Sequence, residues 1–72
     1  MKMSTRNRLP GIVTEVVKDE VMAKVTLRVG DNHIVALITR ESCEELGLEP
    51  GKEATALVKA TSVMLLTEDG AA

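Results

Sequence analysis

The sequence VMAKVTLRVGDN, residues Val21–Asn32, places an aliphatic side chain at every second position from Val21 to Val29. A period of two is typical of a β-strand with one buried face and one face in solvent. Gly30-Asp31-Asn32 then supplies residues that favour a tight hairpin turn, and apolar residues return from Ile34 to Ile38. This part of the chain therefore predicts two antiparallel strands joined by a hairpin.

Residues 39–52 predict one short helix followed by a turn. Thr39 is suited to cap the helix, Glu41 places a carboxylate in its first turn, and Gly47 is suited to end it in a left-handed conformation. We expect the helix to extend through Glu45 or Leu46. Leu48-Glu49-Pro50-Gly51-Lys52 carries Pro and Gly in the two central positions of a type II turn.

The segments on either side of this centre predict further strands. Leu9, Ile12, Val13, Val16 and Val17 also fit helical spacing, but Pro10-Gly11 and the β-branched residues favour a strand, broken or bulged near Gly11 and apolar on both faces. Lys18-Asp19-Glu20 predicts a turn. Two more strands are expected at Ala54–Lys59 and Val63–Leu66. The predicted fold is all-β, a small five-stranded OB-like barrel with one short helix between strands 3 and 4.

Length and composition predict that several copies associate. The chain has 72 residues, no aromatic side chain, one Cys and one His. A chain of this size buries only about 60% of its unfolded surface, so small domains rely on disulfides, metals or oligomerisation. A single Cys excludes an intrachain disulfide, and one Cys with one His cannot form a structural zinc site. We therefore predict a homo-oligomer whose interfaces complete the core.

Charge and hydropathy predict a cytoplasmic protein and argue against several classes of partner. The net charge of −2 gives no general attraction to nucleic acid or anionic lipid, and no apolar run approaches the length of a membrane span. Met1-Lys2-Met3 leads into polar residues instead of a signal-peptide core. Without aromatic side chains for base stacking, an OB-like barrel is a poor nucleic-acid binder. We expect neither a nucleic-acid nor a membrane partner.

The sequence predicts no enzyme. His33 lies by a hairpin turn, where a solvated histidine is common, and Cys43 on the short helix has no neighbouring base. Glu44 and Glu45 are adjacent and would point in different directions on a helix. The chain contains no Gly-rich phosphate loop.

Hydrogen-bond donors are concentrated in three segments. Residues 4–8, STRNR, contain no carboxylate, and Lys59-Ala60-Thr61-Ser62 forms a second group between two predicted strands. Thr39 and Ser42 begin the helix. A fully deprotonated tetrahedral dianion presents only acceptors, so a site lined by such donors would hold it and would reject hydrogenphosphate, whose proton would find no acceptor. Taken singly, these segments also fit a solvated terminus, helix caps and an edge-strand charge.

Three ordered motifs resemble the molbindins, a family of small molybdate-binding proteins whose domain also recurs in molybdate-dependent regulators and transporter ATPases. The first is residues 4–11, STRNRLPG, which is similar to the family's opening Ser-Ala-Arg-Asn-x-Leu-x-Gly. The second is residues 38–42, ITRES, followed by ELGL at 45–48, and the third is residues 58–63, VKATSV. The resemblance covers the whole chain except its tail.

This resemblance implies a hexamer, a trimer of dimers, with oxyanion sites at subunit interfaces. One subunit would supply Ser4, the Thr5 amide, Arg6 and Lys59, and its neighbour would supply Thr39 and Ser42. Thr5 replaces the commoner Ala, and Ala60 stands where some relatives have Ser, so Ala60 would contribute only its amide. Thr61 is a candidate to compensate for that loss.

We therefore predict a single domain over residues 1–67, with a flexible tail over 68–72, that binds molybdate, and tungstate by its near-identical size and charge, for intracellular storage. Molybdenum would enter only as the oxyanion, with no separate metal site. Two alternatives stay open at this point. The chain could be an oligomerisation module without a ligand, or, with less support, a nucleic-acid binder.

Overall fold

The hairpin predicted from Val21–Asn32 lies at the centre of the structure, a computed structural model that describes residues 7–71. Strand β2 (Met22–Val29) pairs with β3 (Asn32–Thr39) through a turn at Gly30 and Asp31. Gly30 has a φ of 60°, and no residue other than glycine has a positive φ in the described chain, which is the pattern of a type II′ turn. The hairpin is confirmed.

The buried core is small and centres on β2. Within residues 7–71, the fully buried apolar side chains are Val13, Ala23, Val25, Leu27 and Cys43. Three of them come from β2 at every second residue, so the alternation read from the sequence is confirmed. Val21 is the exception, because it precedes the strand in a turn and leaves 67% of its surface exposed.

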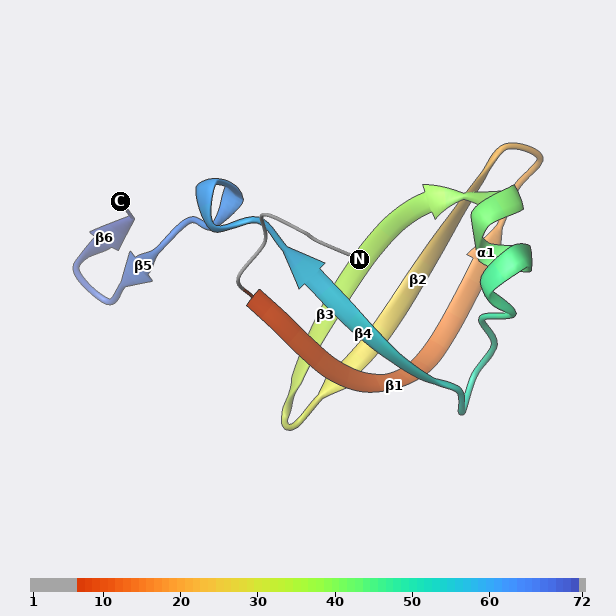
Figure 1. Cartoon of the computed structure of the whole chain (residues 1–72). Coiled ribbons are helices and arrows are strands. Elements are labelled where there is room, and N and C mark those ends of the chain that lie inside the picture. Colours follow the sequence, from red (N-terminus) through yellow and green to blue (C-terminus); the bar gives the residue numbers. More distant parts are fainter. Residues whose placement is uncertain (1–6, 72) are drawn as a thin grey trace.

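Strand β1 (Asn7–Lys18) holds the sheet together. The order in the four-stranded sheet is β3-β2-β1-β4, with all neighbours antiparallel. The first half of β1 pairs with β4 (Glu53–Val58) through Asn7–Ile12, and the second half pairs with β2. This change of partner curls the sheet into an open half-barrel (Figure 1).

The irregularity in β1 lies further along the strand than the sequence suggested. The register shifts between Val13 and Glu15, so the expected break near Gly11 is wrong. Gly11 serves a different purpose, because a Cβ built there would lie 2.5 Å from the carbonyl oxygen of Arg28 on β2. The residue at this position must lack a side chain so that β1 and β2 can approach closely where β1 changes partner.

Helix α1 (Arg40–Leu46) covers one end of the half-barrel and buries Cys43. Gly47 follows it with a φ of 65°, its N–H donates to Glu44 O, and the Leu48 N–H donates to Cys43 O. These bonds form a Schellman motif, so the predicted left-handed terminator is confirmed. The type II turn at Glu49–Lys52 is confirmed as well, since Gly51 has a φ of 95° and Lys52 N donates to Glu49 O.

The segment expected as the fifth barrel strand does not join the main sheet. After β4 the chain makes a 3-10 turn, η1 (Ala60–Ser62), and runs away from the body (Figure 1). Strand pairing resumes only in a separate two-stranded ribbon, β5 (Leu66–Thr67) with β6 (Gly70–Ala71). Val63–Leu66 therefore lacks the barrel pairing predicted for it within one chain. The division into a domain and a tail at residue 67 stays a prediction.

No helix in residues 7–71 has the length and apolar character that crossing a membrane requires.

Replacing Gly11 with Ala is expected to destabilise the fold by about 1–3 kcal/mol, because the new methyl group would force β1 and β2 apart. Urea unfolding followed by circular dichroism measures the effect. Glu15→Ala, an exposed position on the same strand, is the matched control and should change stability little. Equal stability of both variants would contradict the close-approach argument.

The turn between β1 and β2 predicts a pH dependence of stability. Asp19 accepts hydrogen bonds from the Met22 and Val21 amides, at 2.7 and 2.8 Å, and these bonds lower its pKa below the ordinary 3.8. A carboxylate with a lowered folded-state pKa stabilises the protein above its unfolded-state pKa, and this contribution disappears as the pH falls through the folded-state pKa. The melting temperature of the protein should therefore exceed that of Asp19→Ala above about pH 4 and approach it at lower pH. A constant difference between pH 2 and 6 would contradict this account.

Candidate functional site

Among the described residues, the donors expected from the sequence fall into two groups that the fold keeps apart. The first group is Thr39 and Ser42 at the start of α1. The Thr39 hydroxyl accepts the Ser42 N–H at 3.0 Å and lies 2.8 Å from the Ser42 hydroxyl, to which it donates. Thr39 is thus the predicted N-cap, and its hydroxyl both accepts a hydrogen bond from Ser42 and donates one to it.

This arrangement determines which donors remain for a ligand. The Arg40 N–H donates to Val21 O at 2.8 Å and the Ser42 N–H is held by Thr39, so these two amides of the first turn are already used. The Ser42 hydroxyl accepts from Thr39, which leaves its own proton directed elsewhere. Ser42 is therefore the main hydrogen-bond donor that this group offers to an outside acceptor.

The surface beside Thr39 is acidic. A shallow hollow there is lined by Thr39, Val21 and Arg40 and by the carboxylates of Glu20, Glu41 and Glu44. Arg40 does not balance them, because its Nε lies 3.3 Å from Glu44 and its Nη1 donates to Asp19 O. Among the described residues around this hollow, no cation is free of an ion pair. This half can supply the Ser42 hydroxyl as a donor to an anion, but the positive charge must come from elsewhere.

The second group is Lys59, Ala60 and Thr61, where β4 passes into the 3-10 turn. Ser62 N donates to Lys59 O at 2.9 Å and Val63 N to Ala60 O at 3.4 Å. The amides of Ala60 and Thr61 come first in the turn and so have no partner within it. Every residue of this turn is exposed. Over residues 7–71, the ion pairs are Lys18 and Arg40 with Glu44, so Lys59 pairs with no described carboxylate.

Asn7 joins the start of the described chain to this second group. Its side-chain Nδ2 donates to Val58 O at 3.0 Å, and Asn7 and Val58 form the last pair of the β1–β4 ladder. Arg6 precedes Asn7 in the sequence and Lys59 follows Val58. Ser4, Thr5 and Arg6 themselves lie outside the described residues. Asn7 is not among the site residues predicted from the sequence, although it lies within the donor-rich opening at residues 4–8.

The two groups lie at opposite ends of β1. Thr39 pairs with Met22 beside the Lys18 end of the strand, whereas Lys59 follows Val58 at the Asn7 end. The twelve residues of β1 connect these two ends as one continuous, curved strand (Figure 1). One chain therefore does not bring Thr39 and Ser42 together with Lys59. A site that uses both groups needs two chains.

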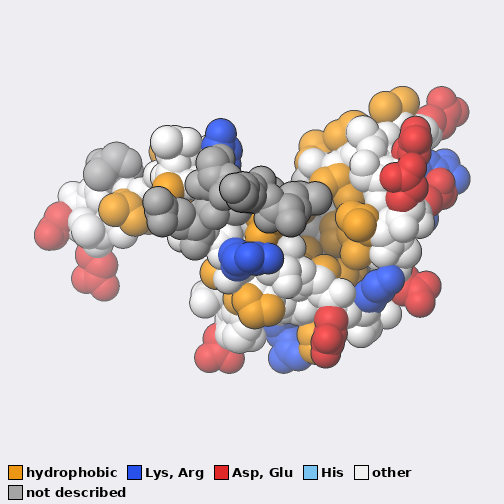
Figure 2. All heavy atoms as spheres, viewed as in Figure 1, with side chains coloured by type: hydrophobic (Ala, Val, Ile, Leu, Met, Phe, Trp, Pro, Cys, Tyr) orange, Lys and Arg blue, Asp and Glu red, His pale blue; other side chains and the backbone are white. Residues whose placement is uncertain are grey.

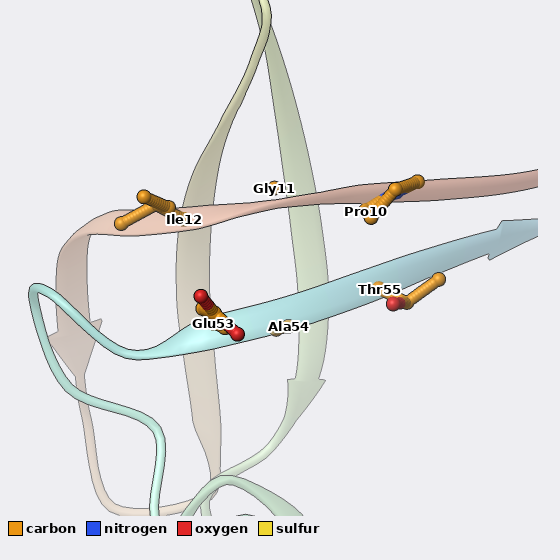
Figure 3. A pocket seen from close by; sticks show the side chains of 6 residues that line it. All are labelled: Pro10, Gly11, Ile12, Glu53, Ala54 and Thr55. Atoms are coloured by element: carbon orange, nitrogen blue, oxygen red, sulfur yellow. The ribbon is translucent and has the colours of Figure 1, made fainter.

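Other surfaces of the described chain offer less chemistry. The hollow between β1 and β4 in Figure 3 is lined by Pro10, Gly11, Ile12, Glu53, Ala54 and Thr55, and its single charged group is a carboxylate. Cys43 is buried, and His33 sits beside the β2–β3 turn opposite Arg28. Residues 7–71 contain no cluster of three His, Cys, Asp or Glu side chains that could hold a metal ion.

Comparison with known proteins places this geometry in a family. Residues 3–65 match the family model of the TOBE domain. The chain is 46% identical over 67 residues to molybdenum-pterin-binding protein 2 of Clostridium pasteurianum, which covers 92% of this chain and 98% of that protein. It is 49% identical over 69 residues to the molybdenum transport protein ModE of Azotobacter vinelandii, of which it covers 26%.

The fold is shared with solved structures as well. A molybdate-binding protein from Sporomusa ovata is similar with a TM-score of 0.87 and 46% identity, over 93% of this chain and all of that one. ModG, described as a cytoplasmic molybdate-binding protein and solved with molybdate bound, gives a TM-score of 0.78 at 39% identity, over 83% of this chain and 43% of that one. The all-β, OB-like fold class predicted from the sequence is confirmed, and so is the resemblance carried by the three motifs.

Substituting Thr39 by Ala should destabilise the protein by about 1 kcal/mol, because the helix loses its capping oxygen. Urea unfolding at a fixed protein concentration measures this loss. Thr39→Ser keeps the hydroxyl and should retain most of the stability. If Thr39→Ser were as unstable as Thr39→Ala, the loss would belong to the methyl group and its packing instead of the cap.

Proposed function

We propose that this chain, which belongs to the TOBE-domain family, binds molybdate at sites formed between its copies. The observation that carries the proposal is the likeness, over nearly the full chain, to proteins whose names and titles state molybdate or molybdenum-pterin binding. The separation of the two donor groups along β1 supports the position between copies. Molybdate is the cargo of such a protein, and no reaction is required of the site.

The chemistry of the donors suits this ligand. A tetrahedral dianion with no proton has only acceptor oxygens, and the assigned side chains offer N–H and O–H groups. We assign Ser4, the Thr5 amide, Arg6, Lys59, the Ala60 amide and Thr61 to one copy, and Thr39 and Ser42 to its neighbour. Hydrogenphosphate carries a proton, and a site that presents only donors to the ligand oxygens would discriminate against it, which requires that the carboxylates beside Thr39 lie outside direct contact with the ligand.

The two halves have complementary charge in this assignment. The surface at Thr39 carries carboxylates and a guanidinium already engaged by Glu44, so it would hold a dianion poorly alone. Lys59 is exposed and has no described carboxylate partner, and Arg6 precedes Asn7, which is tied to the end of β4. Arg6 and Lys59 would neutralise the dianion, and Ser42 would donate its remaining hydroxyl proton.

Finer parts of the function follow from the same assignment. Tungstate has nearly the same size and charge as molybdate and should bind the same site. We propose a cytoplasmic homo-oligomer, a hexamer built as a trimer of dimers, that stores the oxyanion. An anion that binds only between copies stabilises the assembly by mass action, so ligand and assembly should favour each other.

Isothermal titration with molybdate, tungstate, sulfate and phosphate in parallel tests the ligand. Molybdate and tungstate should bind with micromolar or tighter affinity, because several charge-assisted hydrogen bonds of about 1.5–3 kcal/mol each converge on the ion. Phosphate should bind much more weakly. A stable multimer in native mass spectrometry that takes up no oxyanion would instead favour an oligomerisation module.

Arg6→Ala should weaken molybdate binding by roughly 2 kcal/mol, about thirtyfold in Kd, because a cation is lost from a desolvated site. Arg28→Ala is the matched control, since Arg28 is exposed on β2 and has no assigned ligand contact. An affinity unchanged by Arg6→Ala would remove this residue from the site.

A further inference from the structure

One carboxylate on α1 engages two cations. Glu44 Oε2 lies 3.3 Å from Arg40 Nε, on the same helix, and 3.7 Å from Lys18 Nζ, at the end of β1. The other side of the Arg40 guanidinium is held as well, because its Nη1 donates to Asp19 O at 3.4 Å. Over residues 7–71, every ion pair involves Glu44. This single side chain therefore gathers two of the cations at this end of the molecule.

The paired guanidinium lies beside the expected hydroxyl donors. Arg40 follows Thr39 directly in the chain and lines the same hollow. Figure 2 shows acidic side chains gathered over the end of the molecule that carries α1, with basic side chains among them. A guanidinium is always charged, and its planar set of donors suits oxyanions. An unpaired Arg40 would therefore attract a dianion to this surface without any contribution from Lys59.

The ion pair is poorly placed for stabilising the helix. Arg40 is the first residue of α1 and Glu44 lies in its last turn, so each charge stands at the end where the helix dipole disfavours it. A cation that precedes the carboxylate is also the weaker order of an i,i+4 pair. The two side chains are 47% and 51% exposed, and exposed pairs contribute little to stability. The main effect of the pair is thus on the charge of the surface beside Thr39.

We infer that Glu44 determines which cations bind the oxyanion, because by engaging Arg40 and Lys18 it leaves the positive charge to Lys59 of a second copy. This role of Glu44 rests on the proposed function, in which the helix start and Lys59 belong to different copies. Glu44 itself would touch no ligand and would act through Arg40. Capture of the ion would then depend on assembled copies.

The same pairing limits binding that depends on charge alone. Sulfate has the charge of molybdate and also lacks a proton, so an unpaired guanidinium at the helix start would attract both ions through the same Coulomb interaction. With Arg40 engaged by Glu44, a single chain offers a dianion hydroxyl donors next to carboxylates, which is an unfavourable surface. Glu44 would therefore act as a specificity-determining residue for the assembled site.

Isothermal titration with molybdate tests this role in Glu44→Gln, which keeps the size of the side chain and removes its charge. We expect the affinity to become several-fold tighter, because Arg40 is released. Glu45→Gln is the matched control, since Glu45 is the next residue on α1, is exposed and forms no ion pair within residues 7–71. It removes the same charge and should change the affinity much less. Equal affinities of the two variants would overturn the inference.

A double-mutant cycle provides a readout that a merely structural role of Glu44 would not move. Lys59→Ala is measured in the unaltered protein and together with Glu44→Gln or Glu45→Gln. The loss of molybdate affinity should be several-fold smaller with Glu44→Gln, because Arg40 then supplies a replacement cation, and unchanged with Glu45→Gln. The same loss in all three backgrounds would overturn the inference.

A second substitution identifies the cation that is released. Adding Arg40→Gln to Glu44→Gln should remove the gain in affinity, and a gain that persisted would contradict the assignment to Arg40. Failure of the proposed function is distinguishable from these outcomes, because the unaltered protein would then bind no molybdate. Binding by the unaltered protein, with equal affinities of Glu44→Gln and Glu45→Gln, would contradict the role of Glu44 alone.

Discussion

The change of partner along β1 is the constraint on which the rest of this small fold depends. One strand of twelve residues pairs with β4 over its first half and with β2 over its second half. This arrangement requires the backbone of β2 to approach Gly11 so closely that any side chain there would contact the Arg28 carbonyl. The resulting curl encloses a core of five fully buried side chains among the described residues, and it leaves β3 and β4 as separate edges.

The same strand determines where the functional groups lie. Because β1 connects the two ends of the half-barrel, it places the Lys59 group and the Thr39–Ser42 group at opposite ends of one strand. Charge follows this division, since the surface at Thr39 is acidic and Lys59 is free of described carboxylates. Among the described residues, neither end combines an unpaired cation with the hydroxyls of the helix start, and the proposed site between copies would bring the two together.

Local sequence signals predicted most of the fold because their causes are local. The period of two in Val21–Val29, the Thr39 cap, the Gly47 terminator and the Pro50-Gly51 turn each depend on a few neighbouring residues. The position of the bulge in β1 depended instead on contacts between strands, so a glycine needed for close approach was read as a break. The N-cap role of Thr39 was predicted correctly, but the acidic hollow beside it was not, because Glu20 reaches it from another turn of the chain.

The fifth predicted strand differs from these cases. Its sequence has the apolar pattern of a strand, but it does not pair with the main sheet of its own chain. Val63–Leu66 has the composition of a buried strand, yet every one of its residues is exposed. A core this small gains from each apolar side chain that leaves water, at about 25 cal/mol per Å² of apolar surface. Covering Val63–Leu66 would add apolar contacts to a core of only five buried side chains among the described residues, which is the physical reason that the sequence predicts association of several copies.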